Sequence, residues 1–175
     1  TWIEGHVSDQ AFKTAKDQQV EAAAAGDLER DAPFSYGCWI RIERGDFGGA
    51  IFARMNDQAG FQGWDLWMEG GRVGAHIIHQ WPDDALKAVA REPIPVNKWV
   101  HVLVTYDGSS KAEGVKVYYN GQAKPVDITA NSLKSSIKTD VPWKLAQRHT
   151  TARMNGLHVQ DVRIYNRLLS PAEAN

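Results

Sequence analysis

The sequence contains a single cysteine, Cys38, among 175 residues. One cysteine cannot form a disulfide within the chain, a multi-cysteine zinc site or the Cys-x-x-Cys-His motif that attaches c-type haem. No apolar run approaches the roughly 18–20 residues that a membrane-spanning helix needs. No charge sign dominates either, since 20 Lys and Arg stand against 21 Asp and Glu, a net charge of −1. We therefore expect no nucleic-acid partner, because no positive excess is available to neutralise phosphates, and no membrane insertion.

Aromatic residues, glycine and proline are what the sequence does contain in quantity. Seven Trp, five Tyr and five Phe stand beside 15 Gly and seven Pro. Aromatic side chains favour β-strands, and Gly and Pro favour turns, so composition alone favours a sandwich or barrel of short strands. The length suits one domain, and we expect residues 1–175 to form a single domain of a longer multidomain protein.

Alternating apolar positions predict β-strands along most of the chain. From Phe34 to Ile42 every second residue is apolar or aromatic, and these residues share one face because successive side chains of a strand point to opposite sides. Cys38 belongs to that face, which predicts a buried structural thiol. The dipeptides Gly70-Gly71 and Asn120-Gly121 suit the tight turns of hairpins. The predicted strands cover residues 34–42, 50–54, 63–68, 72–81, 86–90, 98–106, 115–119, 143–147 and 157–165.

Two segments towards the ends of the chain have a different character. Residues 18–28 contain four consecutive alanines and suit a helix by propensity, although a strand over residues 19–23 fits equally well. Ser170, Pro171 and Glu173 form the pattern of a helix N-terminus, with an N-cap serine, a proline after it and a glutamate three residues on. The sequence therefore predicts that a short C-terminal helix starts here.

Four blocks in order along the chain resemble laminin-G-like, concanavalin A-like jelly-roll domains. They are Phe34-Ser-Tyr-Gly-Cys-Trp-Ile, Trp99-Val-His-Val-Leu-Val-Thr-Tyr-Asp-Gly, Val117-Tyr-Tyr-Asn-Gly and Asp161-Val-Arg-Ile-Tyr-Asn-Arg-Leu-Leu-Ser, and together they span residues 34–173. Segments 63–67, 71–84 and 114–118 are also similar to the laminin-G-like module of large planctomycete-type proteins that carry cytochrome c-like domains. In such a protein, haem would belong to other domains.

The resemblance implies an all-β fold, a two-sheet antiparallel sandwich of jelly-roll type, and it favours a strand over residues 19–25. Members of the family bind carbohydrates, glycoproteins or other proteins, often with calcium near the binding rim, and some relatives are glycoside hydrolases. It also implies an extracellular or cell-envelope location. The family's closing strand commonly carries two acidic residues where this chain has Gln160-Asp161. Asp27, Asp31 and Asp161 therefore remain as candidate calcium ligands, and no cofactor is expected to be required.

Catalytic patterns are missing from the sequence. The hydrolases of this fold place their carboxylates as Glu-x-Asp-x-x-Glu on one strand; Glu29 and Asp31 start that pattern, but Phe34 occupies its last position. His76 and His79 lie three residues apart on a predicted strand, so they point to opposite faces and cannot readily share a metal ion. His101 is predicted to be a packed core histidine. We therefore expect no enzymatic activity.

Residues 61–84 concentrate the groups that bind sugars. Sugar rings stack their C–H faces on aromatic side chains, and polar side chains fix their hydroxyls. Trp64 and Trp99 are expected in the core, whereas Trp67 and Trp81 fit an exposed or a buried position equally well. His79 and Trp81 are expected on one side. The candidate ligand-binding residues are Trp67, Trp81, Asp65, Arg72, His79, Asp83 and Asp84.

The sequence is therefore interpreted as a non-catalytic module that binds glycan through edge loops or a concave sheet face. One alternative is a structural module that docks on other domains of its parent by protein–protein contact. A second is a divergent glycoside hydrolase, which requires two opposed carboxylates in a cleft. The polar segment 148–153 is expected to be a solvated loop, or alternatively the rim of a site.

Overall fold

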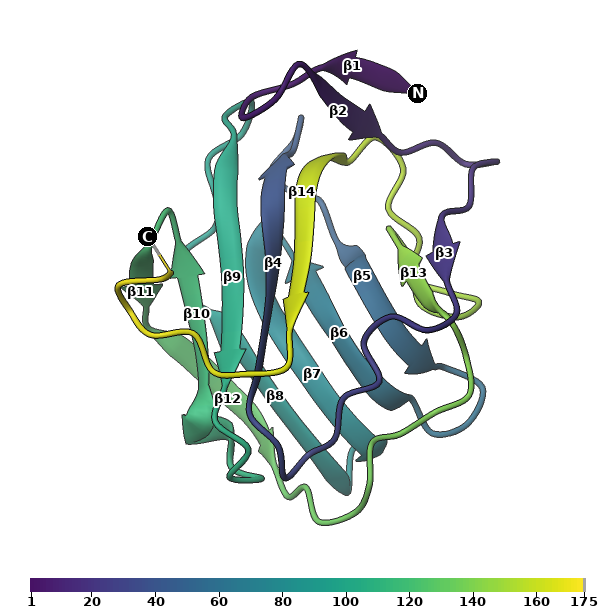
Figure 1. Ribbon diagram of the computed structural model, residues 1–175, viewed down its shortest axis with the longest axis vertical. Coiled ribbons are helices and arrows are strands. Elements are labelled where there is room, and N and C mark those ends of the chain that lie inside the picture. The colour runs from purple at the N-terminus through teal and green to yellow at the C-terminus, as the bar shows by residue number, and fades with distance from the viewer. Residues whose placement is uncertain (175) are drawn as a thin grey trace.

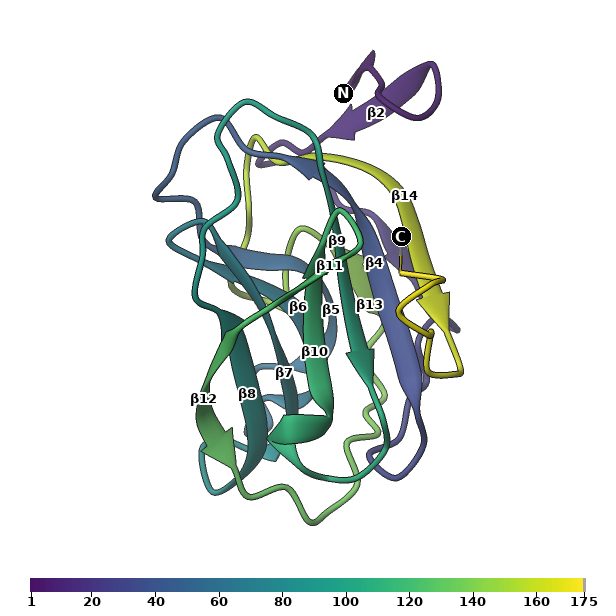
Figure 2. The same ribbon diagram turned by 90° about the vertical axis from the view of Figure 1, so that its left-hand side faces the viewer.

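The computed structural model describes residues 1–174 and shows two seven-stranded sheets packed face to face (Figures 1 and 2). The front sheet of Figure 1 runs β1 (Trp2–Glu4), β2 (Gln10–Lys13), β14 (His158–Tyr165), β4 (Phe34–Arg41), β9 (Val100–Tyr106), β10 (Val115–Tyr119) and β11 (Gln122–Lys124). The back sheet runs β12 (Val126–Asn131), β8 (Asp84–Ala90), β7 (Arg72–Gln80), β6 (Gln62–Glu69), β5 (Gly49–Asn56), β13 (Trp143–Leu145) and β3 (Glu21–Ala22). The strand pairings are antiparallel, so the predicted all-β sandwich is confirmed.

Helical structure is scarce in this fold. In the described part of the chain it consists of one 3-10 turn, η1 (Ala112–Gly114). No helix within residues 1–174 has the length and apolar character that crossing a bilayer requires.

The core lies between the two sheets and follows the predicted alternation. Tyr36 and Cys38 of β4 point inward and are fully buried, and they meet the inward-facing Trp64 and Leu66 of β6. Tyr36 also links the layers, because its hydroxyl donates a hydrogen bond to the backbone oxygen of Asp65 at 3.0 Å. The inner faces therefore hold the two sheets in a fixed relation, and this fixes the positions of the side chains that point outward from the same strands.

Both predicted hairpins are present. Gly70 and Gly71 connect β6 to β7 with φ angles of +56° and +73°. Asn120 and Gly121 connect β10 to β11 with φ angles of +48° and +77°. Positive φ at both central residues is the requirement of a type I′ turn, which explains why these dipeptides carried a usable signal.

The terminal segments resolve the alternatives that the sequence left open. Residues 18–28 contain a strand, β3, which pairs with β13, and the two residues of β3 are fewer than the resemblance implied. Ser170 and Glu173 exchange the expected capping hydrogen bonds, but residues 171–174 form a turn in place of the predicted helix. Strands β1, β2 and β12 were not predicted.

Two aromatic residues expected in the core lie outside it. Trp99 is partly exposed beside Arg41, whose Cζ lies 5.9 Å from the Trp99 ring centroid. His101 is also partly exposed, with its ring centroid 5.4 Å from that of Trp39. Alternation through the start of β9 directs both side chains away from the back sheet, and within residues 1–174 no further sheet covers that outer surface. The core predictions for Trp99 and His101 are therefore wrong.

Candidate functional site

A depression on the outer face of the back sheet collects side chains from distant parts of the chain. It has a volume of about 180 Å³ and is called here the Trp67–Trp81 pocket. Its lining residues are Phe61 from the β5–β6 turn, Trp67 of β6, His76 and Ile78 of β7, Trp81 just beyond β7, and Arg148 from the loop after β13.

Strand alternation and register place the central residues of this site. Trp64 and Leu66 point into the core, so Asp65 and Trp67, their neighbours in β6, point to the outer face. The β6–β7 register pairs Asp65 directly with His76. The carboxylate and the imidazole are therefore brought together by the pairing of two adjacent strands.

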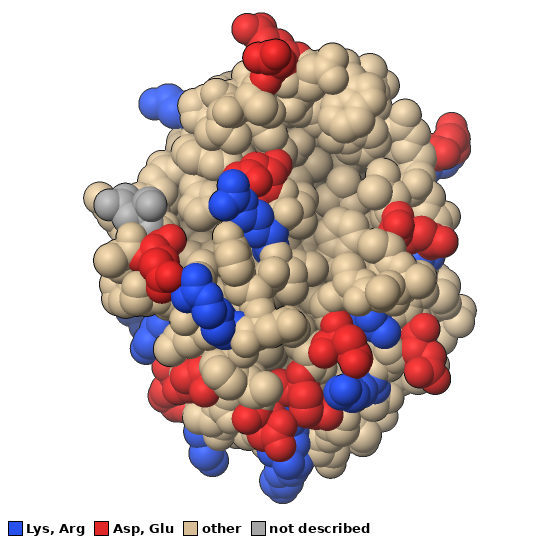
Figure 3. Space-filling view, viewed as in Figure 1, with Lys and Arg blue, Asp and Glu red and all other residues tan. Residues whose placement is uncertain are grey.

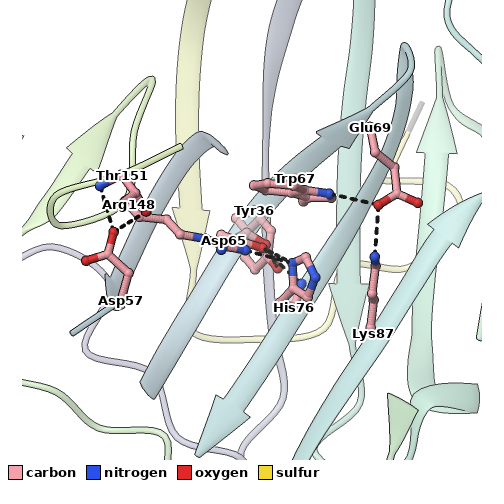
Figure 4. Close-up of polar contacts among 9 residues, drawn as sticks. All are labelled: Tyr36, Asp57, Asp65, Trp67, Glu69, His76, Lys87, Arg148 and Thr151. Carbon is pink, nitrogen blue, oxygen red and sulfur yellow. Dashed lines mark hydrogen bonds and ion pairs between the residues drawn. The ribbon is translucent and has the colours of Figure 1, made fainter. Parts of the chain in front are cut away.

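Asp65 is the centre of a buried ionic network (Figure 4). Its Oδ1 accepts hydrogen bonds from the His76 backbone N at 3.0 Å and from His76 Nδ1 at 2.9 Å. Its Oδ2 accepts from Arg148 Nε at 2.9 Å and Nη2 at 2.7 Å. A buried carboxylate needs this degree of compensation, because leaving it unpaired costs several kcal/mol.

The network fixes the ionisation of Asp65 and the tautomer of His76. Burial favours the neutral acid, but the charges of His76 and Arg148 and their hydrogen bonds outweigh it and lower the pKa of Asp65 to about 2. Asp65 is therefore a carboxylate at neutral pH, and the hydrogen on its bond to His76 belongs to Nδ1. In a neutral ring, Nε2 is then a hydrogen-bond acceptor.

The aromatic side chains of the pocket surround this network. Arg148 Cζ lies 4.4 Å from the Trp67 ring centroid and 5.1 Å from that of Phe61. The His76 ring packs edge-on between the two tryptophans, with centroid distances of 5.3 Å to Trp67 and 5.6 Å to Trp81. Trp67 and Trp81 are both partly exposed and line the same depression.

Charged residues at the edge of the pocket orient Trp67. Its Nε1 donates to Glu69 Oε2 at 3.1 Å, and Lys87 Nζ donates to the same oxygen at 2.8 Å (Figure 4). Arg72 pairs with the other oxygen of Glu69 at 3.2 Å. Arg72, a predicted ligand-binding residue, therefore lies behind the rim and does not line the pocket.

The loop that carries Arg148 is held onto the sheet. Asp57 accepts hydrogen bonds from the backbone N of Thr150 at 3.2 Å and of Thr151 at 2.7 Å, and from both threonine hydroxyls. Arg148 itself is buried, and its backbone N donates to the Thr151 oxygen at 3.0 Å. The expectation of a solvated loop over residues 148–153 is therefore wrong for Arg148. The alternative, in which this segment lines the rim of a site, fits the position of Arg148.

Three other predicted ligand-binding residues lie outside the pocket. His79 Nδ1 bonds the Ser136 backbone oxygen at 2.7 Å, and Asp84 accepts from the backbone N of Lys134 at 2.5 Å. These two residues secure the loop after β12. Asp83 is exposed in the β7–β8 turn and lines none of the pocket.

The expectation that His79 and Trp81 share one side is wrong. Trp81 packs on His76, whereas His79 bonds the loop at Ser136. The pairing of β7 with β8 shifts register between Ile78 and Gln80, and the strand ends there, so simple alternation no longer holds. The prediction that His76 and His79 point to opposite faces and do not share a metal ion stays a prediction.

The three candidate calcium ligands are not gathered into a cluster. Asp27 pairs with Lys138 at 3.0 Å, and Asp161 pairs with Arg163 at 2.8 Å. Asp31 is exposed in the loop before β4. In the portion of the chain that the structure describes, no group of three or more His, Cys, Asp or Glu side chains is placed to hold a metal ion.

Comparisons with known proteins place the chain by fold. A laminin-G-like family model described as the concanavalin A-like lectin/glucanases superfamily matches residues 14–175. The binding domain of Paraclostridial Mosquitocidal Protein 1 is similar, with a TM-score of 0.73, 16% identity, and coverage of 99% of this chain and 44% of that one. No curated protein matches by sequence.

Two botulinum neurotoxin structures are also similar. The receptor binding domain of botulinum neurotoxin D has a TM-score of 0.70 and 16% identity, with 99% of this chain and 44% of that one covered. The serotype G binding domain has a TM-score of 0.68 and 14% identity, with 99% and 43% covered. The chain thus spans less than half the length of these structures, and identities this low show a shared fold alone.

Proposed function

The chain belongs to the concanavalin A-like lectin/glucanases superfamily, and we propose that it is a non-catalytic module that binds glycan in the Trp67–Trp81 pocket. One observation carries the proposal: two partly exposed tryptophans line the same depression on either side of His76. Aromatic rings offer flat apolar surfaces to the C–H faces of sugars. In a pocket of about 180 Å³, a single sugar unit at a chain end or side branch suits the available space.

The polar groups of the pocket complement the hydroxyls of such a ligand. His76 Nε2 has no hydrogen-bond partner within residues 1–174, and its tautomer makes it an acceptor. Arg148 uses Nε and Nη2 on Asp65, which leaves Nη1 as a donor. An acceptor beside a donor suits neighbouring hydroxyls, which both donate and accept. Because Asp65 neutralises Arg148, the arrangement favours a neutral sugar.

The same geometry supports a binding role over a hydrolytic one. Glycoside hydrolysis needs two carboxyl groups about 5–10 Å apart on either side of the bond. The residues that line the pocket include no carboxylate. Asp65 lies beneath them, fully buried with both oxygens bonded, and its pKa of about 2 makes it unsuited to donate a proton at neutral pH.

The proposal extends to where the module works. The similar structures are binding domains, two of them from botulinum neurotoxins and one of these a receptor binding domain. By analogy, we place this module in a multidomain protein outside the cell or in the cell envelope, where glycans are the accessible ligands. We expect the pocket to bind its ligand without calcium, because its polar lining side chains are His76 and Arg148, and calcium prefers oxygen ligands.

A glycan array tests the proposal. The purified chain is applied with calcium and with a chelator, and we expect the same glycans to be bound in both conditions. Loss of all binding in chelator would show that calcium is required. A folded chain that binds no glycan in either condition would overturn the proposal and favour the protein-docking alternative. Release of reducing sugar from a bound glycan would identify a hydrolase instead.

A further inference from the structure

A second and larger hollow lies on the opposite side of the sandwich, on the outer face of the front sheet. It has a volume of about 350 Å³ and is called here the Trp39–Tyr165 groove. Trp39, His101, Leu103, Asp161, Arg163 and Tyr165 are among its lining residues. Its size falls in the range of roughly 300–1,000 Å³ that is typical of small-molecule sites.

The groove is closed on one side by the segment that follows β14. This segment crosses the front sheet towards β10 and β11 (Figure 1). Ser35 Oγ donates to the Arg167 backbone oxygen at 2.9 Å and accepts from the Leu169 backbone N at 2.9 Å. Leu169 packs with Leu103 and Tyr118, so the floor of the groove is apolar and fixed.

A bulge in β14 directs an additional side chain to this face. The β4–β14 register shifts between Gln160 and Arg163, so one more residue of β14 than of β4 occupies this stretch. Asp161 sits at the bulge with a φ of +52°. A left-handed backbone conformation is strained for a non-glycine residue, and such residues cluster at functional sites. The bulge brings Asp161 beside Arg163, and both line the groove.

Several polar groups around the apolar floor are free to meet a ligand. Arg163 Nε donates to Asp161 Oδ1 at 2.8 Å, and the guanidinium also interacts with the Tyr165 side chain. A guanidinium carries five N–H donors, so these two contacts leave donors for a ligand. The His101 ring also makes no hydrogen bond within residues 1–174. Burial lowers the pKa of His101, so at neutral pH its ring offers one donor and one acceptor.

The charges at this groove balance. Asp161 pairs with Arg163, and Glu173 pairs with Arg167 at 2.8 Å. In the view of Figure 3, acidic and basic side chains on this face lie next to one another in pairs, and uncharged surface separates the pairs. Two complete ion pairs give no net field that would select an anion or a cation, so a neutral, polyhydroxylated ligand fits better than a charged one.

We propose that the Trp39–Tyr165 groove is a second sugar-binding site that takes a neutral pyranose ring against Trp39 and His101, with Arg163 and Asp161 bound to its hydroxyls. This site and the Trp67–Trp81 pocket are on opposite outer faces of the sandwich. One domain can then hold two glycan chains at once and bridge them. The groove is built from its own residues and does not depend on the proposed function of the pocket.

The test compares variants of the whole chain on the glycan array. Trp39→Ala and Arg163→Ala alter the groove, and Trp67→Ala/Trp81→Ala alters the pocket. Arg44→Ala is the matched control, because Arg44 is similarly exposed and also pairs with an aspartate, Asp46, at 3.1 Å. Arg163 has a side chain 61% exposed, so its removal leaves the fold intact even if Trp39→Ala does not.

The proposal predicts a set of glycans that the pocket variant still binds and that both groove variants bind at least about tenfold more weakly. Native mass spectrometry is then expected to detect two sugars per chain for the unmodified protein and one for Arg163→Ala. Unchanged binding by both groove variants overturns the proposal while leaving the pocket intact. Binding lost only in the groove variants supports the groove and refutes the pocket. The proposal of a second sugar site is also overturned if the array shows no bound glycan, or if a peptide is the only ligand that binds in the groove.

Discussion

Arg148 donates two hydrogen bonds to a single carboxylate oxygen of Asp65, at 2.9 and 2.7 Å, across 83 residues of sequence. The pair is buried, and it attaches the loop after β13 to the centre of the back sheet. The same arginine packs on the Trp67 ring. The ionic pair therefore holds in place one of the two aromatic surfaces of the pocket.

Removing one partner of this pair is expected to destabilise the fold strongly. Arg148→Met leaves the buried Asp65 carboxylate without its main counter-ion, and we expect a loss of about 3–5 kcal/mol in the free energy of unfolding. The double variant Asp65→Asn/Arg148→Met is expected to lose less than the sum of the two single variants. Urea denaturation of the four proteins measures the coupling, and additive losses would contradict it. Arg44→Met, an exposed control, is expected to change stability by less than about 0.5 kcal/mol.

The pair also predicts a specific dependence of stability on pH. Because the pKa of Asp65 is lowered to about 2, against about 3.9 in the unfolded chain, its contribution is complete above about pH 5. The contribution falls as acid is added and is lost below pH 2, and its size is on the order of 2 kcal/mol. The titratable and charged groups that face Asp65 are the His76 imidazole and the Arg148 guanidinium.

The measurement is the free energy of unfolding of the unmodified chain minus that of Asp65→Asn, taken from pH 7 to pH 2. Subtraction removes the contribution of the other carboxylates. We expect the difference to shrink as the pH falls. A difference that stays constant or grows would show that Asp65 is not held as a buried carboxylate.

A third prediction concerns Gly26, which has a φ of +67° and contacts the core. Trp64 Nε1 donates to the Gly26 backbone oxygen at 2.9 Å, and a Cβ at Gly26 would clash with Trp64 Cζ2. Gly70 has a similar φ of +56° with nothing within 4 Å. Gly70→Ala therefore isolates the backbone cost of roughly 1–2 kcal/mol. Gly26→Ala is expected to lose about 1–3 kcal/mol more by thermal or urea unfolding, and equal losses would contradict the close packing.

Local sequence patterns predict part of the structure and not the rest. The core face from Phe34 to Ile42 and the hairpins at Gly70-Gly71 and Asn120-Gly121 follow from rules that act over a few residues. The same rules place Asp65 and Trp67 on the face opposite Trp64. Local rules do not say which surface another segment covers, and this is why Trp99 and His101 were placed in the core in error.

The remaining parts of the site depend on contacts between distant segments. In the sequence, Arg148 stands out only as part of a polar segment, and no pattern near Phe61 suggests a binding site. The sequence therefore does not indicate that Arg148 and Phe61 lie in one pocket with Trp67. His79 and Asp84 resemble ligand-binding residues in sequence, yet they bind the backbone of the loop after β12. A side chain's partner in such cases is decided by tertiary structure. One signal was available in the sequence. A carboxylate such as Asp65 on a buried strand needs a cationic partner, and this need points to an arginine or lysine elsewhere in the chain.

A fourth prediction concerns the single thiol. Cys38 is fully buried in β4, and burial raises its pKa well above the usual value. A buried thiol held in its protonated form is a poor nucleophile. We expect no reaction with an aromatic disulfide reagent in the native chain and the release of one equivalent of chromophore per chain after unfolding in denaturant. Rapid reaction of the native chain would show that β4 is exposed.

The most direct test of the proposed role is the affinity of Trp81→Ala for a glycan that the array identifies, measured by titration calorimetry. Trp2→Ala is the control, since Trp2 is 66% exposed in β1 of the other sheet. Removing a stacking tryptophan at the centre of a site is expected to weaken binding by about tenfold or more. Because Trp81 also packs on a buried cluster, the titration is run at a temperature at which circular dichroism shows the variant folded. The account predicts this loss for Trp81→Ala and full affinity for Trp2→Ala. Full affinity in Trp81→Ala and Trp67→Ala alike would contradict glycan binding in the pocket.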